Sequence, residues 1–149
     1  MLITKPYEQY VSNFTVIGFS VKTKNSDETN LNTAKIPNLW QQFYASNLAN
    51  KVPTFGVYSD YESDTQGAYT ITVGIAKNHQ KQDYPKQVVI NAGNYLVFKA
   101  IGPLPAVVIS TWQYIWEYFT LHTSYQRNFK SDFEQCNGSN EIAIYIGIQ

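Results

Sequence analysis

The chain has little of what marks several common classes of protein. Its 149 residues include one cysteine, Cys136, which excludes an internal disulfide framework. The 11 basic and 11 acidic residues give a net charge of zero and form no block of one sign. The sequence therefore lacks the clustered basic residues that binding of nucleic acid requires. No apolar run approaches the roughly 20 residues of a membrane span. We therefore expect neither a membrane segment nor direct binding of nucleic acid.

Signatures of cofactor binding and catalysis are also missing. The sequence has no phosphate-binding glycine loop, dinucleotide fingerprint, HExxH motif or GxSxG elbow. His79 and His122 offer no plausible metal cluster with one cysteine, so we expect both to be ordinary solvated residues. Cys136 has no suggestively placed histidine and is expected to be a small buried residue. We predict no cofactor and no metal ion, and nothing in the sequence requires catalysis.

The first ten residues do not resemble a targeting signal. Lys5 and Glu8 interrupt them, and they lack the apolar core of a signal peptide. A chain with neither a leader nor a membrane span is expected in the cytoplasm. The length fits one domain over residues 1–149.

Aromatic residues are what the chain has in excess. Tyr, Phe and Trp number 12, 8 and 3, and together they make up 15% of the sequence. A β-rich fold explains part of this excess, because tyrosine suits strands. An aromatic ligand site is the other explanation, because tyrosine packs its ring and keeps a polar handle.

One sequence pattern occurs twice along the chain. Trp40, in Leu-Trp-Gln, and Trp112, in Thr-Trp-Gln, are 72 residues apart. Val-Gly-Ile at 73–75 recurs in the same order as Ile-Gly-Ile at 146–148. These markers indicate a duplicated unit, with half-units of about 1–78 and 79–149. Two half-domains that bury a common face would leave a seam between them, and an aromatic seam is a natural ligand cleft.

Hydrophobic periodicity predicts the elements of each half. Strands are predicted at 14–23, 55–61, 69–76, 87–90, 95–100, 133–136 and 141–148. Amphipathic helices are predicted at 36–48 and 106–119, a polar loop at 24–34, and a linker between the halves at 77–84. The order is strand, helix, strand, strand, twice, with room for an added strand in each half. This order predicts an α+β fold, in which an antiparallel sheet carries its helices on one face.

Two carboxylates stand beside aromatic residues in these elements. Glu117 follows a tryptophan on the second helix, and because successive helix positions do not share a face, we expect it to reach water. Alternation along a strand places Glu134 on the face opposite Phe133 and leaves two orientations open. Glu134 faces either water or the helices and the seam. If Phe55 and Phe133 are aligned between the halves, the mate of Glu134 is Gly56, and only one half carries a charge into the cleft.

A carboxylate buried among aromatic rings would have a clear physical use. Burial without a partner is costly, so its pKa should rise in the empty site. A cationic ligand would restore a partner and favour the ionised form. Aromatic faces would add cation–π attraction of roughly 0.5–2 kcal/mol each. Such a site would select flat, apolar, positively charged molecules.

Eight short motifs stand in order along the chain, at 39–40, 55–58, 69–75, 93–98, 102–103, 111–112, 133–134 and 144–146. Each motif is short, and together, in order and with the duplication, they are fairly specific. Through them the sequence resembles the GyrI-like effector-binding family over essentially its whole length. This family includes the ligand-binding domains of AraC-type and BmrR-type multidrug-responsive regulators.

The resemblance implies two βαββ half-units related by a pseudo-twofold axis. It also implies a central cleft for amphipathic, often cationic, compounds. Glu134 matches the acidic residue of the family, and Tyr145 matches its tyrosine in the last strand. The other residues expected to bind the ligand are Trp116, Tyr44, Tyr58, Phe55 and Trp112, the last of which could instead belong only to the core.

We predict non-catalytic binding of a cationic, aromatic or amphipathic small molecule, with a buried glutamate as its counter-charge. No helix-turn-helix precedes the matching region, so the chain is expected to be a stand-alone binding module. A separate transcription-regulator or other protein partner is left open. Two alternatives use the same fold: a hydrolase of small reactive compounds, and a module that inhibits a protein target such as gyrase.

Overall fold

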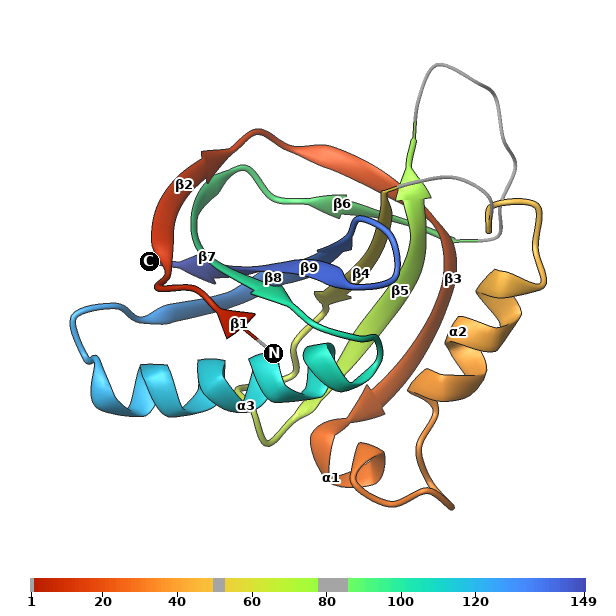
Figure 1. Cartoon of the computed structure of the whole chain (residues 1–149), viewed down its shortest axis with the longest axis horizontal. Coiled ribbons are helices and arrows are strands. Elements are labelled where there is room, and N and C mark those ends of the chain that lie inside the picture. Colours follow the sequence, from red (N-terminus) through yellow and green to blue (C-terminus); the bar gives the residue numbers. More distant parts are fainter. Residues whose placement is uncertain (1, 50–52, 78–85) are drawn as a thin grey trace.

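The computed structural model describes residues 2–49, 53–77 and 86–149, which form nine strands and three helices (Figure 1). The helices are α1 (Asn25–Glu28), α2 (Ile36–Tyr44) and α3 (Ala106–Leu121). The strands are β1 (Leu2–Ile3), β2 (Tyr7–Val11), β3 (Phe14–Lys24), β4 (Thr54–Ser59), β5 (Ala68–Ala76), β6 (Lys86–Ile90), β7 (Gly93–Ile101), β8 (Arg127–Cys136) and β9 (Glu141–Ile148). His79 and all but the first residue of the predicted linker lie outside the described residues.

All nine strands belong to one antiparallel sheet. Its order is β1-β7-β9-β8-β4-β5-β3-β6, and β2 also pairs with β7. The series β3-α2-β4-β5 is followed along the chain by β7-α3-β8-β9, each with a short strand before it. The predicted α+β fold and its strand–helix–strand–strand order are therefore confirmed. The duplication that would explain this order stays a prediction.

The ends of the sheet are linked by a long curved ribbon. Val11 pairs with Gly93 and Phe14 pairs with Ile90, so the β2–β7 and β3–β6 pairings keep one register across the two-residue bends between them. The ribbon of β2 and β3 is the red arc of Figure 1. Behind it, on the sheet face away from the helices, lies a small aromatic core. Its buried members are Val16, Phe55, Val57, Ile90, Tyr95 and Phe133.

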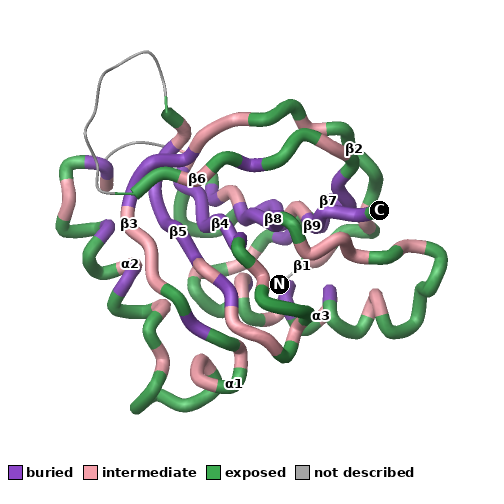
Figure 2. The backbone as a smooth tube through the Cα atoms, turned by 180° about the vertical axis from the view of Figure 1, so that it is seen from behind, coloured by how far each residue is buried: buried purple, intermediate pink, exposed green. Residues whose placement is uncertain are grey.

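The two longer helices pack on the other face of the sheet and build the main core. Leu39 and Phe43 of α2 are buried there, as are Val107 and Ile115 of α3. Burial gathers on the central strands and on the inner sides of the helices (Figure 2). The alternate positions of β9 that face the helices are all isoleucine: Ile142, Ile144, Ile146 and Ile148. The prediction that both helices lie on one face is confirmed.

Several element boundaries differ from the predicted ones for local reasons. Helix α2 ends at Tyr44 instead of 48, because the Ser46 hydroxyl donates to the Phe43 carbonyl at 2.6 Å and accepts from Leu48 N–H at 3.2 Å. The predicted loop at 24–34 contains α1, whose Glu28 carboxylate accepts N–H groups at the start of α2. Strands β1 and β2 were not predicted. Strand β8 begins at 127 rather than 133. Its first half is polar and its register with β9 shifts, so hydrophobic alternation did not reveal the first six residues.

The close approach of β3 and β5 depends on glycine at one pair, Gly18 opposite Gly74. A methyl group on Gly18 would collide with the Val73 carbonyl oxygen, which cannot move without disturbing the ladder. We expect Gly18→Ala to lower the free energy of unfolding by about 1–3 kcal/mol in urea titrations. Lys22→Ala, at an exposed site of the same strand, should change it by less than about 0.5 kcal/mol. Wild-type stability of Gly18→Ala would contradict the steric argument.

Candidate functional site

Glu134 lies at the middle of the sheet and points toward the helices. It is 2% exposed. One carboxylate oxygen, Oε2, accepts hydrogen bonds from the Tyr58 hydroxyl at 3.2 Å and from Trp112 Nε1 at 3.1 Å. Strands β4 and β8 and helix α3 thus each supply one residue of this group. Of the two orientations that the sequence left open, the structure has Glu134 on the helix side.

A glycine on the neighbouring strand makes room for this carboxylate. Gly56 pairs directly with Glu134 across β4 and β8. A methyl group on Gly56 would lie 2.8 Å from Glu134 Oε1 and 3.0 Å from its Cγ. Gly56, which the alignment of the two halves placed at the position of Glu134, is therefore also its pairing partner in the sheet. Because glycine has no side chain, the glutamate side chain can lie over it.

Burial without a cationic partner dominates the electrostatics of Glu134. Desolvation raises the pKa of its carboxyl from 4.5 to about 7, although the hydrogen bonds from Trp112 and Tyr58 act in the opposite direction. The ion pairs found within residues 2–49, 53–77 and 86–149 are Lys22–Glu62 and Arg127–Asp132. Glu134 belongs to neither pair.

A second buried carboxylate lies two residues away on the same face, and its surroundings are different. Asp132 is 0% exposed. Its Oδ2 accepts from Arg127 Nη2 at 2.7 Å and from the Tyr61 hydroxyl at 2.5 Å, and its Oδ1 accepts from Gly147 N–H at 2.8 Å. Asp132 is therefore neutralised by Arg127, whereas Glu134 has no ion-pair partner in the part of the chain that the structure describes.

Aromatic rings lead from Glu134 toward the surface of α3. The Trp112 ring meets Tyr58 edge-on, with centroids 5.1 Å apart, and lies 6.1 Å from the Trp116 ring. Trp112 is 9% exposed, whereas Trp116 is 42% exposed. Tyr69 continues the buried cluster behind Tyr58 at 5.5 Å. Glu134 is therefore covered by two rings, with a third exposed one turn along the helix.

Tyr44 approaches the same region from α2. It is 60% exposed, and its pKa is raised by burial and also by the neighbouring Cys136 thiol. Cys136 is 6% exposed and lies on the helix face of β8, two residues after Glu134. The expectation that this cysteine is a small buried residue is confirmed.

Two predicted ligand residues lie on the opposite side of the sheet. Phe55 is buried in the small aromatic core, and the Tyr145 ring stacks on Phe133 with centroids 4.4 Å apart. Alternation explains the difference, since Phe55 precedes Gly56 by one position and Tyr145 lies between two isoleucines that face the helices. The structure does not bring these two residues together with Glu134.

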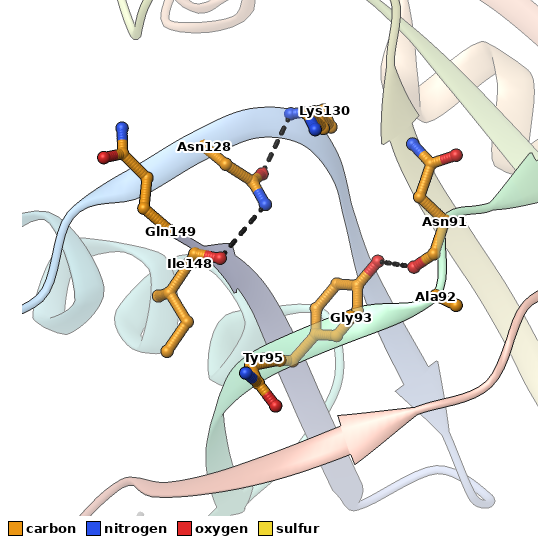
Figure 3. A pocket seen from close by; sticks show the side chains of 9 residues that line it. Asn91, Ala92, Gly93, Tyr95, Asn128, Lys130, Ile148 and Gln149 are labelled. Atoms are coloured by element: carbon orange, nitrogen blue, oxygen red, sulfur yellow. Dashed lines mark hydrogen bonds between the residues drawn. The ribbon is translucent and has the colours of Figure 1, made fainter.

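An open pocket lies elsewhere, where the β6–β7 bend, the start of β8 and the last residues meet (Figure 3). The Tyr95 hydroxyl donates to the Asn91 carbonyl at 2.5 Å there, and Asn128 Nδ2 donates to the Ile148 carbonyl at 3.2 Å. The lining residues are Asn91, Ala92, Gly93, Asn94, Tyr95, Asn128, Lys130, Ile148 and Gln149. A smaller hollow lies between β3 and α2. Neither is lined by Glu134, whose carboxylate lies beneath its covering rings.

Sequence reasoning missed the polar and aromatic partners around this site. Tyr61, Tyr69, Arg127 and Asp132 were not singled out. Asp132 carried a usable signal, because it lies two positions before Glu134 and must share its face of a strand. Outside the site, Glu117 and His122 are exposed as expected. In the described part of the chain, no helix is long and apolar enough to cross a membrane.

An antiparallel sheet with its two longer helices on one face is the GyrI-like fold that the sequence resemblance implied. Residues 9–148 match the family described as Cass2, integron-associated effector binding protein. The match covers nearly the whole chain, and the chain belongs to this family.

Three similar proteins extend the comparison. An integron cassette protein from the mobile metagenome of Vibrio cholerae is 32% identical, with a TM-score of 0.89 over 99% of this chain and 97% of that one. "Putative transcriptional regulator protein YobU" of Bacillus subtilis (strain 168) is 28% identical over an alignment of 148 positions, which covers 89% of this chain and 90% of that protein. SAV2435, bound to tetraphenylphosphonium, shares the fold with a TM-score of 0.74, 16% identity and coverage of 98% and 94%.

The raised pKa of Glu134 predicts that the fold weakens as pH rises. The folded protein keeps the proton up to about pH 7, whereas the unfolded chain releases it near 4.5, so stability is lost between these values. Glu134→Gln cannot ionise. Relative to wild type, its free energy of unfolding should rise by roughly 3 kcal/mol between pH 4.5 and 8 in urea titrations. Glu117→Gln, at an exposed site, should show no such trend, and a flat difference for Glu134→Gln would contradict the assignment.

Proposed function

We propose that this protein binds cationic aromatic or amphipathic small molecules, with Glu134 as the counter-charge. The observation that carries the proposal is a carboxylate that is 2% exposed and held by two hydrogen-bond donors, and that forms no ion pair with any cation of the described residues. Membership of an effector-binding family supports a small-molecule ligand. The structure of SAV2435 with tetraphenylphosphonium supports a cationic one.

The energetics favour a cation over other ligands. An ionised carboxylate out of water is costly unless it is paired, and a ligand cation would supply the pairing charge. The faces of Tyr58 and Trp112 would add cation–π attraction of roughly 0.5–2 kcal/mol each. A neutral ligand of the same shape would gain the ring contacts but would leave Glu134 uncompensated.

The ligand would reach Glu134 from the exposed end of the aromatic series. Trp116 of α3 lies beside the Trp112 ring, Tyr44 of α2 lies near Cys136, and both are partly exposed, so we propose that they receive the ligand first. Because Tyr58 and Trp112 cover the carboxylate, the ligand must push at least one of these rings aside. Phe55 and Tyr145 have no part in this proposal, because they lie across the sheet.

Binding rather than turnover is the activity we propose. The cysteine beside Glu134 is a poor nucleophile, since burial raises the pKa of the Cys136 thiol to about 12. The glutamate itself already accepts two hydrogen bonds on one oxygen. We propose that residues 1–149 act as one domain of two half-units, without a cofactor and without touching nucleic acid directly.

Removal of the charge at position 134 tests the proposal. We expect Glu134→Gln to weaken the binding of a flat cationic dye at pH 8 by roughly tenfold to a hundredfold, because one charge-assisted interaction is lost. The measurement is quenching of tryptophan fluorescence on titration with the dye. Glu117→Gln is the matched control and should bind as wild type does. Equal affinities of wild type and Glu134→Gln would exclude the proposed role of Glu134.

Proton release on binding is a second test. The bound cation favours the ionised carboxylate, so a protein that starts protonated below pH 7 must give up a proton. Affinity for a dye of fixed charge should therefore rise from pH 5.5 to 8 and then level off. Calorimetric titrations in two buffers of different ionisation heat would count the proton. A pH-independent affinity, or a rise that persists in Glu134→Gln, would speak against this linkage.

A further inference from the structure

Two buried carboxylates of β8 share one face, and among residues 2–49, 53–77 and 86–149 Asp132 has an ion-pair partner whereas Glu134 has none. Asp132 and Glu134 are two positions apart on the strand, which places their backbones roughly 7 Å apart. Tyr58 pairs with Asp132 in the sheet and donates its hydroxyl to Glu134. The two acids therefore stand in one aromatic environment rather than in separate regions of the core.

Arg127 lies among aromatic rings and beside a carboxylate, which are the surroundings that a ligand cation would also need. Its guanidinium carbon lies 4.4 Å from the centroid of the Phe129 ring and 6.0 Å from those of Tyr61 and Trp112. Its Nη2 donates to Asp132 at 2.7 Å, and the two side chains are 7% and 0% exposed. A carboxylate with ring faces around a cation is the same chemistry as we propose for Glu134.

The indole of Trp112 joins the two charges. Its Nε1 donates to Glu134, and its ring faces the guanidinium of Arg127. Arg127 Nε is buried and has no hydrogen-bond partner among the described residues. The guanidinium is thus held through Nη2 and by ring faces, and it does not use the two-pronged geometry of which arginine is capable. What it supplies to this region is mainly one positive charge.

We propose that Arg127 sets the number of positive charges that the ligand site accepts. This inference rests on the function proposed above and adds a specificity to it. With Asp132 neutralised by Arg127, the region carries one net negative charge, that of ionised Glu134. A monocation brings the region to neutrality, whereas a rigid dication leaves an uncompensated positive charge in a buried place. Arg127 is a specificity-determining residue in this scheme, and it needs no contact with the ligand.

Two flat cations of nearly the same shape make the test. Methyl viologen is a rigid dication, and 1-methyl-4-(4-methylphenyl)pyridinium is a monocation in which one ring nitrogen is replaced by carbon. Each is titrated at pH 8 with tryptophan fluorescence as the readout. Wild type should prefer the monocation by tenfold or more. Two unit charges about 7 Å apart, in a medium of effective dielectric constant near 20, interact strongly enough to change affinity by roughly tenfold to a hundredfold.

Variants that change the charge count should move this preference in opposite directions. Arg127→Gln leaves two carboxylates and can still donate an amide hydrogen to Asp132, so the preference should fall by tenfold or more and turn toward the dication. The double variant Arg127→Gln/Asp132→Asn returns the count to one negative charge, and it should prefer the monocation as wild type does. Urea titration checks that each variant is folded.

Asp132→Asn provides an independent arm if Arg127→Gln does not fold. It retains Arg127 and Glu134, so the net charge of the region becomes zero, and affinity for the monocation should fall by tenfold or more although Glu134 is intact. Equal affinity of wild type for the two probes, or an unchanged preference in Arg127→Gln, would overturn the charge count. So would wild-type affinity for the monocation in Asp132→Asn.

The design separates this inference from the function on which it rests. If wild type binds the monocation and Glu134→Gln does not, the proposed function stands whatever the variants at 127 and 132 show. If wild type does not bind the monocation, or binds it no better than Glu134→Gln does, the role of Glu134 fails, and the charge count fails with it.

Discussion

The pairing of β4 with β8 puts Gly56 opposite Glu134, and the candidate site depends on that pair. A side chain at 56 would occupy the space of the carboxylate and would push it toward the helix. With glycine there, the glutamate lies over the sheet, where Tyr58 and Trp112 reach the same oxygen. The site therefore depends on a difference between two paired strands: β4 supplies space at Gly56, and β8 supplies the charge of Glu134.

The sheet separates two kinds of aromatic packing. On the face away from the helices, Phe133 stacks with Tyr145 and packs beside Phe55, and these rings serve as core. On the helix face, the rings of Tyr58 and Trp112 are engaged by a carboxylate as well as by each other. Aromatic content alone could not distinguish these roles, because they differ only in which side of a strand each residue occupies.

Much of the fold could be predicted because its elements have clear periods. The strands that became β3, β5 and β9 alternate or run apolar over their full length, and the second helix shows a continuous apolar face. The site could be predicted only in part. Glu134 was a candidate with its orientation undecided, and a one-residue change of register decides whether a side chain faces the helices. Arg127 escaped because the polar first half of β8, with its shifted register, has no alternation to follow, and Asp132 escaped because the predicted strand began one residue after it.

The cost of burying Glu134 also bears on how such a protein can change over generations. An acid that weakens the folded state above neutral pH is one that selection for stability alone would replace by a neutral residue. If that residue were also smaller than glutamate, position 56 would be free to gain a side chain, because the space over it would no longer be filled. Under the function proposed above, a descendant that no longer meets the ligand would thus be expected to lose Glu134 and the glycine at 56 together.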